Sequence, residues 1–329
     1  MKHERSGLLT ILMVGCGLWS VGCATAPYRL GRFQTSGDDG RAQRVVFEYG
    51  EPHKVLDRMA WVAALPTRIL PLNRKVNSHT LSPETSGKLE TYLVENDLTD
   101  VLVRVNQYDP GGEWRRLRQN RWMSPGWKYT FGSASVIGYT LFPGRVFGGD
   151  LYNPFTNSLY VNSDVPAILI VEAAYAKDIH ARSLPGAYAA VNEFPVLTLW
   201  RHTLAVNDTL GYALKEDDWE LERETYRTVY PLMGVHAAMG GHTAASWMTA
   251  MPMITVPISM VGGAVLGHTV GQTTISQRER ERKSEADEKF AAREPIKLPE
   301  GPKAAEVESG IQLTGFAEMS VSEAATEQK

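Results

Sequence analysis

Cysteine is almost absent from this chain of 329 residues. Only Cys16 and Cys23 occur, and both lie within the first 23 positions. A disulfide framework, a cysteine zinc site and a cysteine nucleophile are therefore excluded from the rest of the chain. A basic excess is also lacking, because residues 1–277 hold 25 basic and 25 acidic side chains. A nucleic-acid binder needs surplus Lys and Arg to neutralise phosphates, so we expect no nucleic-acid partner.

Charge of either sign is missing from one long segment. The 50 residues from 228 to 277 contain no Asp, Glu, Lys or Arg, although these types make up 22% of the chain. Within this segment Gly263, Gly267 and Gly271 recur at a spacing of four, which lets two helix backbones approach closely. We therefore predict that this glycine face packs against a partner helix, within the chain or on another copy.

Two interpretations of the uncharged segment remain open. In the first, residues 246–271 cross or dip into a membrane, since their number exceeds the roughly 20 residues that a span requires. In the second, residues 231–271 form a buried helical hairpin on the globular domain. Basic residues flank both ends, so a hairpin would keep both clusters on one side of a membrane. We favour membrane association.

The N-terminus has the pattern of an export signal. A short basic start at residues 1–5 precedes an uncharged, mostly apolar run from Gly7 to Val21. The sequence Ser20-Val21-Gly22-Cys23 resembles the lipobox of bacterial lipoproteins, although Ser20 stands where Leu is usual. This resemblance implies that Cys23 is acylated and becomes the new N-terminus, which places the body in the bacterial cell envelope. The alternative is an uncleaved N-terminal anchor.

Composition divides the chain into six segments. We expect a signal peptide at 1–22, a tether at 23–40, a globular domain at 41–227, an uncharged Gly-rich helical segment at 228–277, a charged helix at 278–294 and a disordered tail at 295–329. In the domain, spacing and capping residues predict helices over 54–65, 83–95, 113–117, 165–179, 195–212 and 216–230. They predict strand segments over 101–105, 147–150 and 157–161, with a turn at 153–156. The fold class that follows is α+β.

The helix predicted over 165–179 can be compared with H-E-x-x-H, the helical motif of zinc peptidases. In that motif two His at i and i+4 bind the metal and the intervening Glu polarises a water. Here Glu172 is retained, but Val171 and Tyr175 replace the two His. The former metal positions therefore lack their nitrogen ligands.

The surrounding sequence strengthens this comparison. A strand edge closely followed by the metal helix is the layout of gluzincin-type peptidases, and residues 101–178 resemble a family of uncharacterised bacterial proteins with a gluzincin-like core. The resemblance extends roughly from residue 50 to 271. It implies a zincin-like domain with a small sheet and several helices. It also implies that a Glu on the next long helix is the third ligand, where His202 is the nearest substitute in this chain.

This member departs from the pattern at both His positions and at the third ligand, so no zinc or other cofactor is expected. Four further histidines are interpreted as hydrogen-bonded residues between helices rather than ligands: His180, His236, His242 and His268. The carboxylate of Glu172, if buried, needs a partner, and we expect Tyr175 or His202 to supply it.

The sequence therefore predicts a membrane-anchored envelope lipoprotein with a catalytically inactive zincin-like domain. Its expected role is binding or scaffolding, with an extended peptide or envelope protein held at the strand edge near Leu159–Val161. One alternative is a hydrolase with a rearranged site around Glu172 and His202. The other is a structural membrane protein that acts through residues 231–271.

Overall fold

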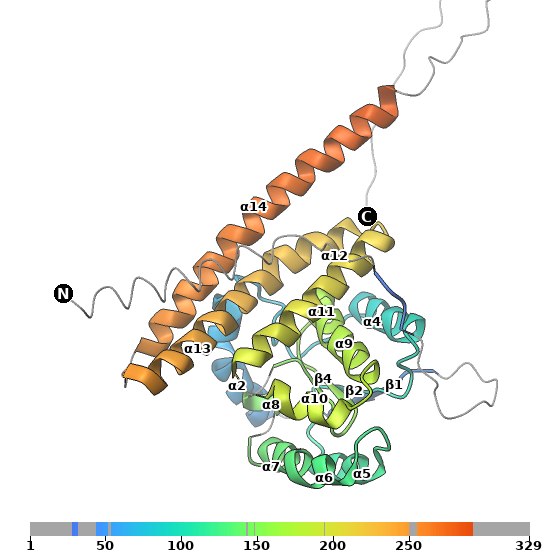
Figure 1. Ribbon diagram of the computed structural model, residues 1–329, viewed down its shortest axis with the longest axis vertical. Coiled ribbons are helices and arrows are strands. Elements are labelled where there is room, and N and C mark those ends of the chain that lie inside the picture. The colour runs from blue at the N-terminus through green and yellow to red at the C-terminus, as the bar shows by residue number, and fades with distance from the viewer. Residues whose placement is uncertain are drawn as a thin grey trace, which may run out of the picture. The chain divides into compact units, whose positions relative to one another are not determined.

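The computed structural model describes residues 28–31, 44–51, 54–142, 144–147, 149–193, 195–249 and 255–291 (Figure 1). The chain separates into two compact units, residues 1–281 and 282–329, and of the second only residues 282–291 are described. The predictions for the signal peptide, Cys23, most of the tether and the tail concern residues outside these ranges.

A small mixed sheet lies at the centre of the first unit. Its strands are β1 (Val46–Tyr49), β2 (Leu102–Val105), β3 (Leu151–Asn153) and β4 (Ser158–Val161), in the order β1-β2-β4-β3. The first, second and fourth strands are parallel, and β3 pairs antiparallel with β4 through a turn at residues 154–157. The predicted α+β class is thus confirmed.

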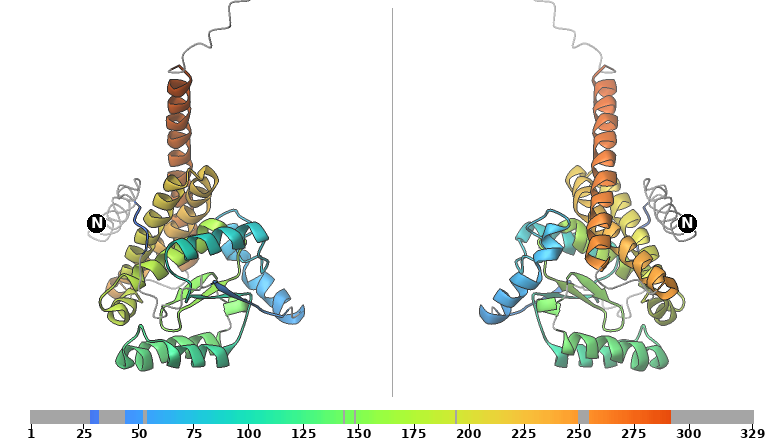
Figure 2. Two further views of the ribbon diagram at one scale, coloured as in Figure 1. Left: turned by 90° about the vertical axis from the view of Figure 1, so that its right-hand side faces the viewer. Right: turned by 90° about the vertical axis from the view of Figure 1, so that its left-hand side faces the viewer.

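Helices cover both faces of this sheet (Figure 2). On one face lie α4 (Pro83–Glu95), α9 (Pro166–His180) and α11 (Pro195–Lys215), which pack on one another. On the other face lie α5 (Pro110–Gln119), the short α6 (Pro125–Trp127), the π-helical turn η1 (Lys128–Gly132) and α7 (Ser133–Leu141). The remaining helices of this part are α2 (Lys54–Ala63), α3 (Leu65–Ile69), α8 (Gly144–Phe147) and α10 (Pro185–Asn192).

The buried side chains explain why α9 is the central helix. Nearly every residue from Ala167 to His180 is buried, so α9 is surrounded on all sides and lacks an amphipathic pattern. Proline opens α4, α5 and α9 at the first turn, where its missing N–H costs nothing. The predicted cap of α4 is confirmed, since Ser82 Oγ accepts a hydrogen bond from Thr85 N at 3.3 Å.

Several predicted boundaries were wrong. Residues 147–150 are not a strand, because Phe147 ends α8 and β3 begins only at Leu151. The Asp150 carboxylate instead accepts hydrogen bonds from the backbone N–H groups of Asn162 and Ser163 at 2.7 and 2.9 Å. The helix expected over 113–117 is longer, since Asp109 caps α5 and starts it at Pro110.

The predicted start of α9 also needs correction. Its N-cap is Val165, with no side-chain hydrogen bond. The predicted caps have other partners, since Ser163 donates to Asp150 and Asp164 accepts from Ser82 N at 3.0 Å. These bonds connect the segment before α9 to the rest of the domain. Of the predicted local signals for the start of α9, only Pro166 therefore acts at its first turn.

The C-terminal part of the first unit is a pair of long helices. The helix predicted over 216–230 begins at Trp219 as α12 (Trp219–Glu224) and continues through the π-helical turn η2 (Thr225–Val229) into α13 (Tyr230–Thr249). The last helix, α14 (Val256–Ala291), begins in the uncharged segment and continues into the second unit. Among the described residues, none of the helices combines the length and the apolar character that a membrane span needs.

Candidate functional site

Glu172 lies on α9 beneath the antiparallel edge strand. Its side chain is buried, and Oε2 accepts a hydrogen bond from the backbone N–H of Tyr152 in β3 at 3.0 Å. Val171 and Tyr175, which the sequence comparison aligned with the two His of the zinc motif, are buried as well. An N–H of the edge strand, the kind of group that a bound peptide would use, is therefore already taken by the protein's own carboxylate.

Arg201 on α11 supplies the positive charge of this site. It is buried, and its guanidinium carbon lies 4.4 Å from the centre of the Tyr175 ring. Burial raises the pKa of Glu172, and the charge of Arg201 and the hydrogen bond from Tyr152 partly oppose that rise. Burial lowers the pKa of Arg201, but Tyr175 and Glu172 outweigh it and the pKa rises. We call Glu172, Tyr175, Arg201 and the Tyr152 N–H the Glu172 cluster.

The partner expected for Glu172 was therefore wrong. The carboxylate accepts its hydrogen bond from the Tyr152 amide, and the charge of Arg201 lowers its pKa, whereas Tyr175 and His202 do not serve as its partners. His202 follows Arg201 by one residue, about 100° around the helix, and its ring stacks on His236 of α13 with 4.6 Å between the centroids. Burial lowers the pKa of His202 well below its usual value, with smaller contributions from His236 and Arg201.

The Glu172 cluster does not fit a zinc ion. Zinc needs three or four N, S or O donors, whereas Val171 offers none and Arg201 places a cation beside the remaining carboxylate. Within the ranges that the structure describes, no three His, Cys, Asp or Glu side chains gather as a metal site would require. Of the other histidines, His268 Nε2 lies 2.9 Å from Leu70 O and so bridges distant segments, as expected, whereas His180 Nδ1 lies 2.8 Å from Ala176 O within its own helix α9.

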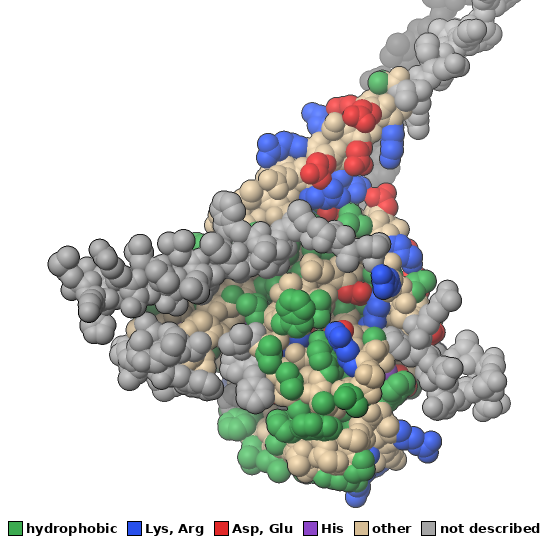
Figure 3. Space-filling view, in the orientation of Figure 1, with side chains coloured by type: hydrophobic (Ala, Val, Ile, Leu, Met, Phe, Trp, Pro, Cys, Tyr) green, Lys and Arg blue, Asp and Glu red, His purple; other side chains and the backbone are tan. Residues whose placement is uncertain are grey.

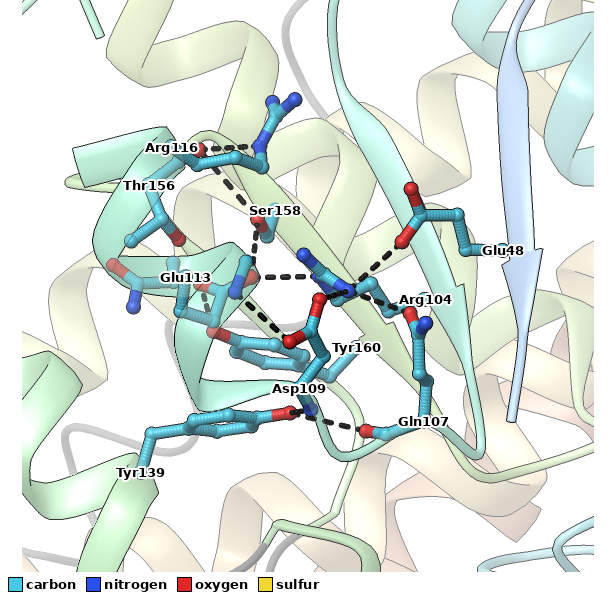
Figure 4. Close-up of polar contacts among 12 residues, drawn as sticks. Glu48, Arg104, Gln107, Asp109, Glu113, Arg116, Tyr139, Thr156, Ser158 and Tyr160 are labelled. Carbon is cyan, nitrogen blue, oxygen red and sulfur yellow. Dashed lines mark hydrogen bonds and ion pairs between the residues drawn. The ribbon is translucent and has the colours of Figure 1, made fainter. Parts of the chain in front are cut away.

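A second buried polar cluster, which sequence reasoning missed, occupies the opposite face of the sheet (Figure 4). Arg104 of β2 is paired with Glu113 of α5 at 2.7 Å and with Glu48 of β1 at 2.8 Å. Glu113 accepts hydrogen bonds from Ser158 at 3.0 Å and from Tyr160 at 2.5 Å, both on β4. Burial and the adjacent Glu113 raise the pKa of Tyr160, so its hydroxyl remains a donor.

The loop after β2 completes this Arg104 cluster. Gln107 Oε1 accepts from Arg104 at 2.6 Å, and Asp109 Oδ2 lies 3.4 Å from the same guanidinium nitrogen. A Cβ on Gly112 would lie 2.0 Å from Asp109 Oδ2 and 2.6 Å from Arg104, so a larger residue there would displace the ends of these two side chains from their present contacts. Alternation along β2 and β4 places Arg104, Ser158 and Tyr160 on one face, but no short sequence motif reports the partners on β1 and α5.

A cavity of about 530 Å³ opens beside the Arg104 cluster. Strand β1, residues 99–104 in and before β2, and helix α5 supply its walls, which are lined by Val46, Glu48, Arg104, Asp109, Arg115 and Arg116 among others. Three backbone carbonyls fix Arg116, namely Thr156 O at 2.8 Å, Asn157 O at 2.6 Å and Asp100 O at 3.2 Å. Arg115 is exposed, so its charge is free to meet a ligand from solvent.

The edge strand beside this cavity, β1, is the one whose outward backbone groups are available to a binding partner. Leu159–Val161 lies in β4, which pairs with β2 on one side and β3 on the other, so the edge predicted there was wrong. Among the described strands β1 pairs only with β2. Gly50 N donates to Val105 O, so alternation turns the N–H groups of Phe47 and Tyr49 away from β2.

The glycines of the uncharged segment lie against the helix that precedes it. A Cβ on Gly263 would lie 2.2 Å from Gly234 O, one on Gly267 would lie 2.3 Å from Tyr230 O, and one on Gly271 would lie 2.2 Å from Tyr226 O. Successive glycines along α14 therefore contact residues that lie successively earlier in the chain, first on α13 and then on η2. The two helices are antiparallel and in backbone contact.

Exposed apolar side chains are widespread and do not by themselves identify a binding surface. On the face in Figure 3, hydrophobic side chains gather over the lower part, where Figure 1 places α10 and the α5–α7 layer. On α14 the outward side chains Ile258, Val261, Val265 and Leu266 are between 49% and 72% exposed.

Searches for related proteins returned no matching family model, no matching curated protein and no matching solved structure.

Proposed function

We propose that this protein is an envelope lipoprotein whose zincin-like domain binds an extended peptide and does not hydrolyse it. The supporting observation is the contrast between the two edges of the sheet. At β3 the outward N–H of Tyr152 already donates a hydrogen bond to Glu172, and the charge of Arg201 acts on that carboxylate. At β1 the outward N–H groups lie beside an open cavity with an exposed arginine.

The zincin-like assignment has support in the order of elements. An antiparallel edge strand, an adjacent parallel strand and a buried helix with a glutamate beneath that edge strand follow one another as β3, β4 and α9. On the next long helix, α11, the buried Arg201 directly precedes His202, the nearest substitute for the family's third ligand. In this proposal the guanidinium takes over the role of the metal as the counter-charge of the glutamate.

Peptide addition at β1 makes a specific demand on the backbone. An added strand would bond to the N–H groups that point away from β2, those of Phe47 and Tyr49. Its alternate side chains would enter the cavity between β1 and α5. Replacing Tyr49, whose side chain is 62% exposed, by Pro removes one of these donors without touching the ladder to β2.

The experiment selects peptides from a displayed library of extended sequences on the full chain in detergent and measures one synthetic ligand by fluorescence anisotropy. We expect Tyr49→Pro and Arg115→Glu each to weaken binding at least tenfold, about 1.4 kcal/mol. Tyr49→Ala, which keeps the backbone N–H, and Arg118→Glu, an exposed arginine of α5 outside the cavity lining, are the matched controls and should bind normally. Binding that is unaffected by both β1-side variants, or a selection without enrichment, would reject this function.

A further inference from the structure

A short N-terminal segment is fixed on the α4 and α11 side of the domain. Tyr28 OH donates to Asn96 Oδ1 at 2.8 Å, and Gly31 N donates to the same oxygen at 2.9 Å. Asn96 is fully buried, and its own Nδ2 donates to Tyr92 O at 2.9 Å. Two hydrogen bonds to one oriented amide determine where the chain lies five residues after Cys23.

The ring of Tyr28 is held as firmly as its hydroxyl. Lys177 Nζ lies 4.0 Å from the ring centre, a cation–π distance, and Lys177 is itself paired with Asp208 at 2.7 Å. The ring of Tyr212 lies 5.5 Å away, and a Cβ on Gly211 would lie 3.3 Å from Tyr28 Cβ. The glycine thus lets the segment lie directly on α11.

We infer that the end of the molecule formed by the C-terminal turns of α4 and α11 faces the membrane. The inference rests on the proposed lipid on Cys23. Only residues 24–27 separate that cysteine from Tyr28, and five residue steps span at most about 18 Å. An acyl chain buried in the bilayer therefore keeps the Tyr28 docking site within that distance of the lipid headgroups.

The surface at this end suits the interfacial region of a bilayer. Leu30, Val94 and Leu214 are 45%, 46% and 43% exposed there. Lys215 Nζ lies 5.6 Å from the Tyr28 ring, and its charge is paired with Glu95 at 3.4 Å and with Glu216 at 2.6 Å. The contact with the bilayer therefore depends on the exposed apolar side chains of this end rather than on a free basic charge.

This orientation is distinct from insertion of the α13–α14 hairpin. α13 has 20 residues, about 30 Å of helix, and leads from η2 away from the end of α11 that carries Tyr212. Ile258, near the start of α14 and 72% exposed, lies at the far end of that pair (Figure 1). A label at Leu214 and a label at Ile258 therefore report different orientations.

The test uses the full chain expressed in a bacterial host and reconstituted in phosphatidylethanolamine–phosphatidylglycerol vesicles. Mass spectrometry first establishes the lipid on Cys23. With Cys16 removed and Cys23 acylated, Leu214→Cys, Ile258→Cys and Tyr129→Cys each provide one thiol for an environment-sensitive fluorophore. Vesicles that contain a lipid with a shallow spin label then quench whichever fluorophore lies at the interface.

We expect the Leu214 label to be quenched several-fold more than the labels at Ile258 and Tyr129. Adding Tyr28→Ala to Leu214→Cys should abolish the difference while the lipid on Cys23 remains and the domain stays folded at the temperature of the assay. Strongest quenching at Ile258, or equal quenching at all three sites, would overturn the orientation while leaving the lipoprotein assignment intact. An unmodified Cys23 would overturn the anchor, and the orientation with it.

Discussion

Arg201 is the residue whose environment differs most from what its sequence position suggests. It is buried with its guanidinium over the Tyr175 ring and its charge acts on Glu172, while its neighbour His202 stacks on His236. We expect Arg201→Met to destabilise the fold by about 3 kcal/mol, because it leaves a buried carboxylate without a counter-charge. Denaturant unfolding at pH 7 measures this. The double variant Arg201→Met/Glu172→Gln should recover most of the loss, and no recovery would contradict the pairing.

Glu172 should make stability depend on pH in a defined sense. Burial raises its folded-state pKa above the unfolded value. The stability that this group contributes is therefore present below the unfolded pKa and is lost as pH rises through the folded pKa. The wild-type chain should lose free energy of unfolding relative to Glu172→Gln as the pH rises above about 4.5, where an unperturbed glutamate ionises. Parallel stability curves for the two proteins over that range would argue against this environment.

The limits of sequence reasoning are also visible at single residues. Helical spacing correctly placed Glu172, Val171 and Tyr175 on one buried helix. It could not choose between Arg201 and His202, because a difference of one residue turns a side chain by about 100° and the rotation of α11 is set by tertiary packing. Arg104 was not recognised at all, since Glu48 and Glu113 reach it from β1 and α5, which lie 56 residues before it and 9 residues after it.

Among the elements, the α13–α14 pair is the one whose packing the sequence indicated most directly. The spacing of four between Gly263, Gly267 and Gly271 predicts a close helix contact, and these positions do lie against backbone atoms of α13 and η2. The glycine spacing did not identify the helix that packs against α14. In this structure it is the preceding helix of the same chain, α13.

Two glycine-to-alanine substitutions on α14 should separate the effect of close contact between the helices from the effect of helix propensity on stability. In Gly267→Ala the new Cβ would lie 2.3 Å from Tyr230 O, so the helices must separate and we expect a lower melting temperature. Gly262→Ala is the matched control: nothing lies within 4 Å of its Cβ, and the gain in helix propensity should stabilise by about 0.5–1 kcal/mol. Equal effects of the two substitutions in thermal unfolding would refute close packing at Gly267.

Strand assignments were less successful than helix assignments for a physical reason. β2 and β4 are short and β-branched or apolar, and their predicted positions hold within one residue. β3 has only three residues, and its place is fixed by pairing with β4 and by the Asp150 carboxylate, which holds the backbone of residues 162 and 163. Such long-range determinants do not appear in local periodicity.

For the whole molecule, the sheet separates two polar centres with different roles. The Glu172 cluster lies under α9 and α11 and is closed by its own residues. The Arg104 cluster lies under α5 and borders the cavity. The α+β class followed from the sequence, whereas the edge open to a partner did not, because strand order depends on how distant segments pair.

We propose that Arg201 stands where a zincin-like domain would have its metal. Zinc content by elemental mass spectrometry, after incubation of the full chain with zinc and removal of the excess, tests it most directly. We predict no stoichiometric zinc in the wild-type chain and stoichiometric zinc in Val171→His/Tyr175→His/Arg201→Glu, which restores a His-His-Glu ligand set. The control Val171→His/Tyr175→His/His202→Glu retains Arg201 and should bind weakly or not at all. Stoichiometric zinc in the wild-type chain, or none in the Arg201→Glu triple variant, would contradict the account.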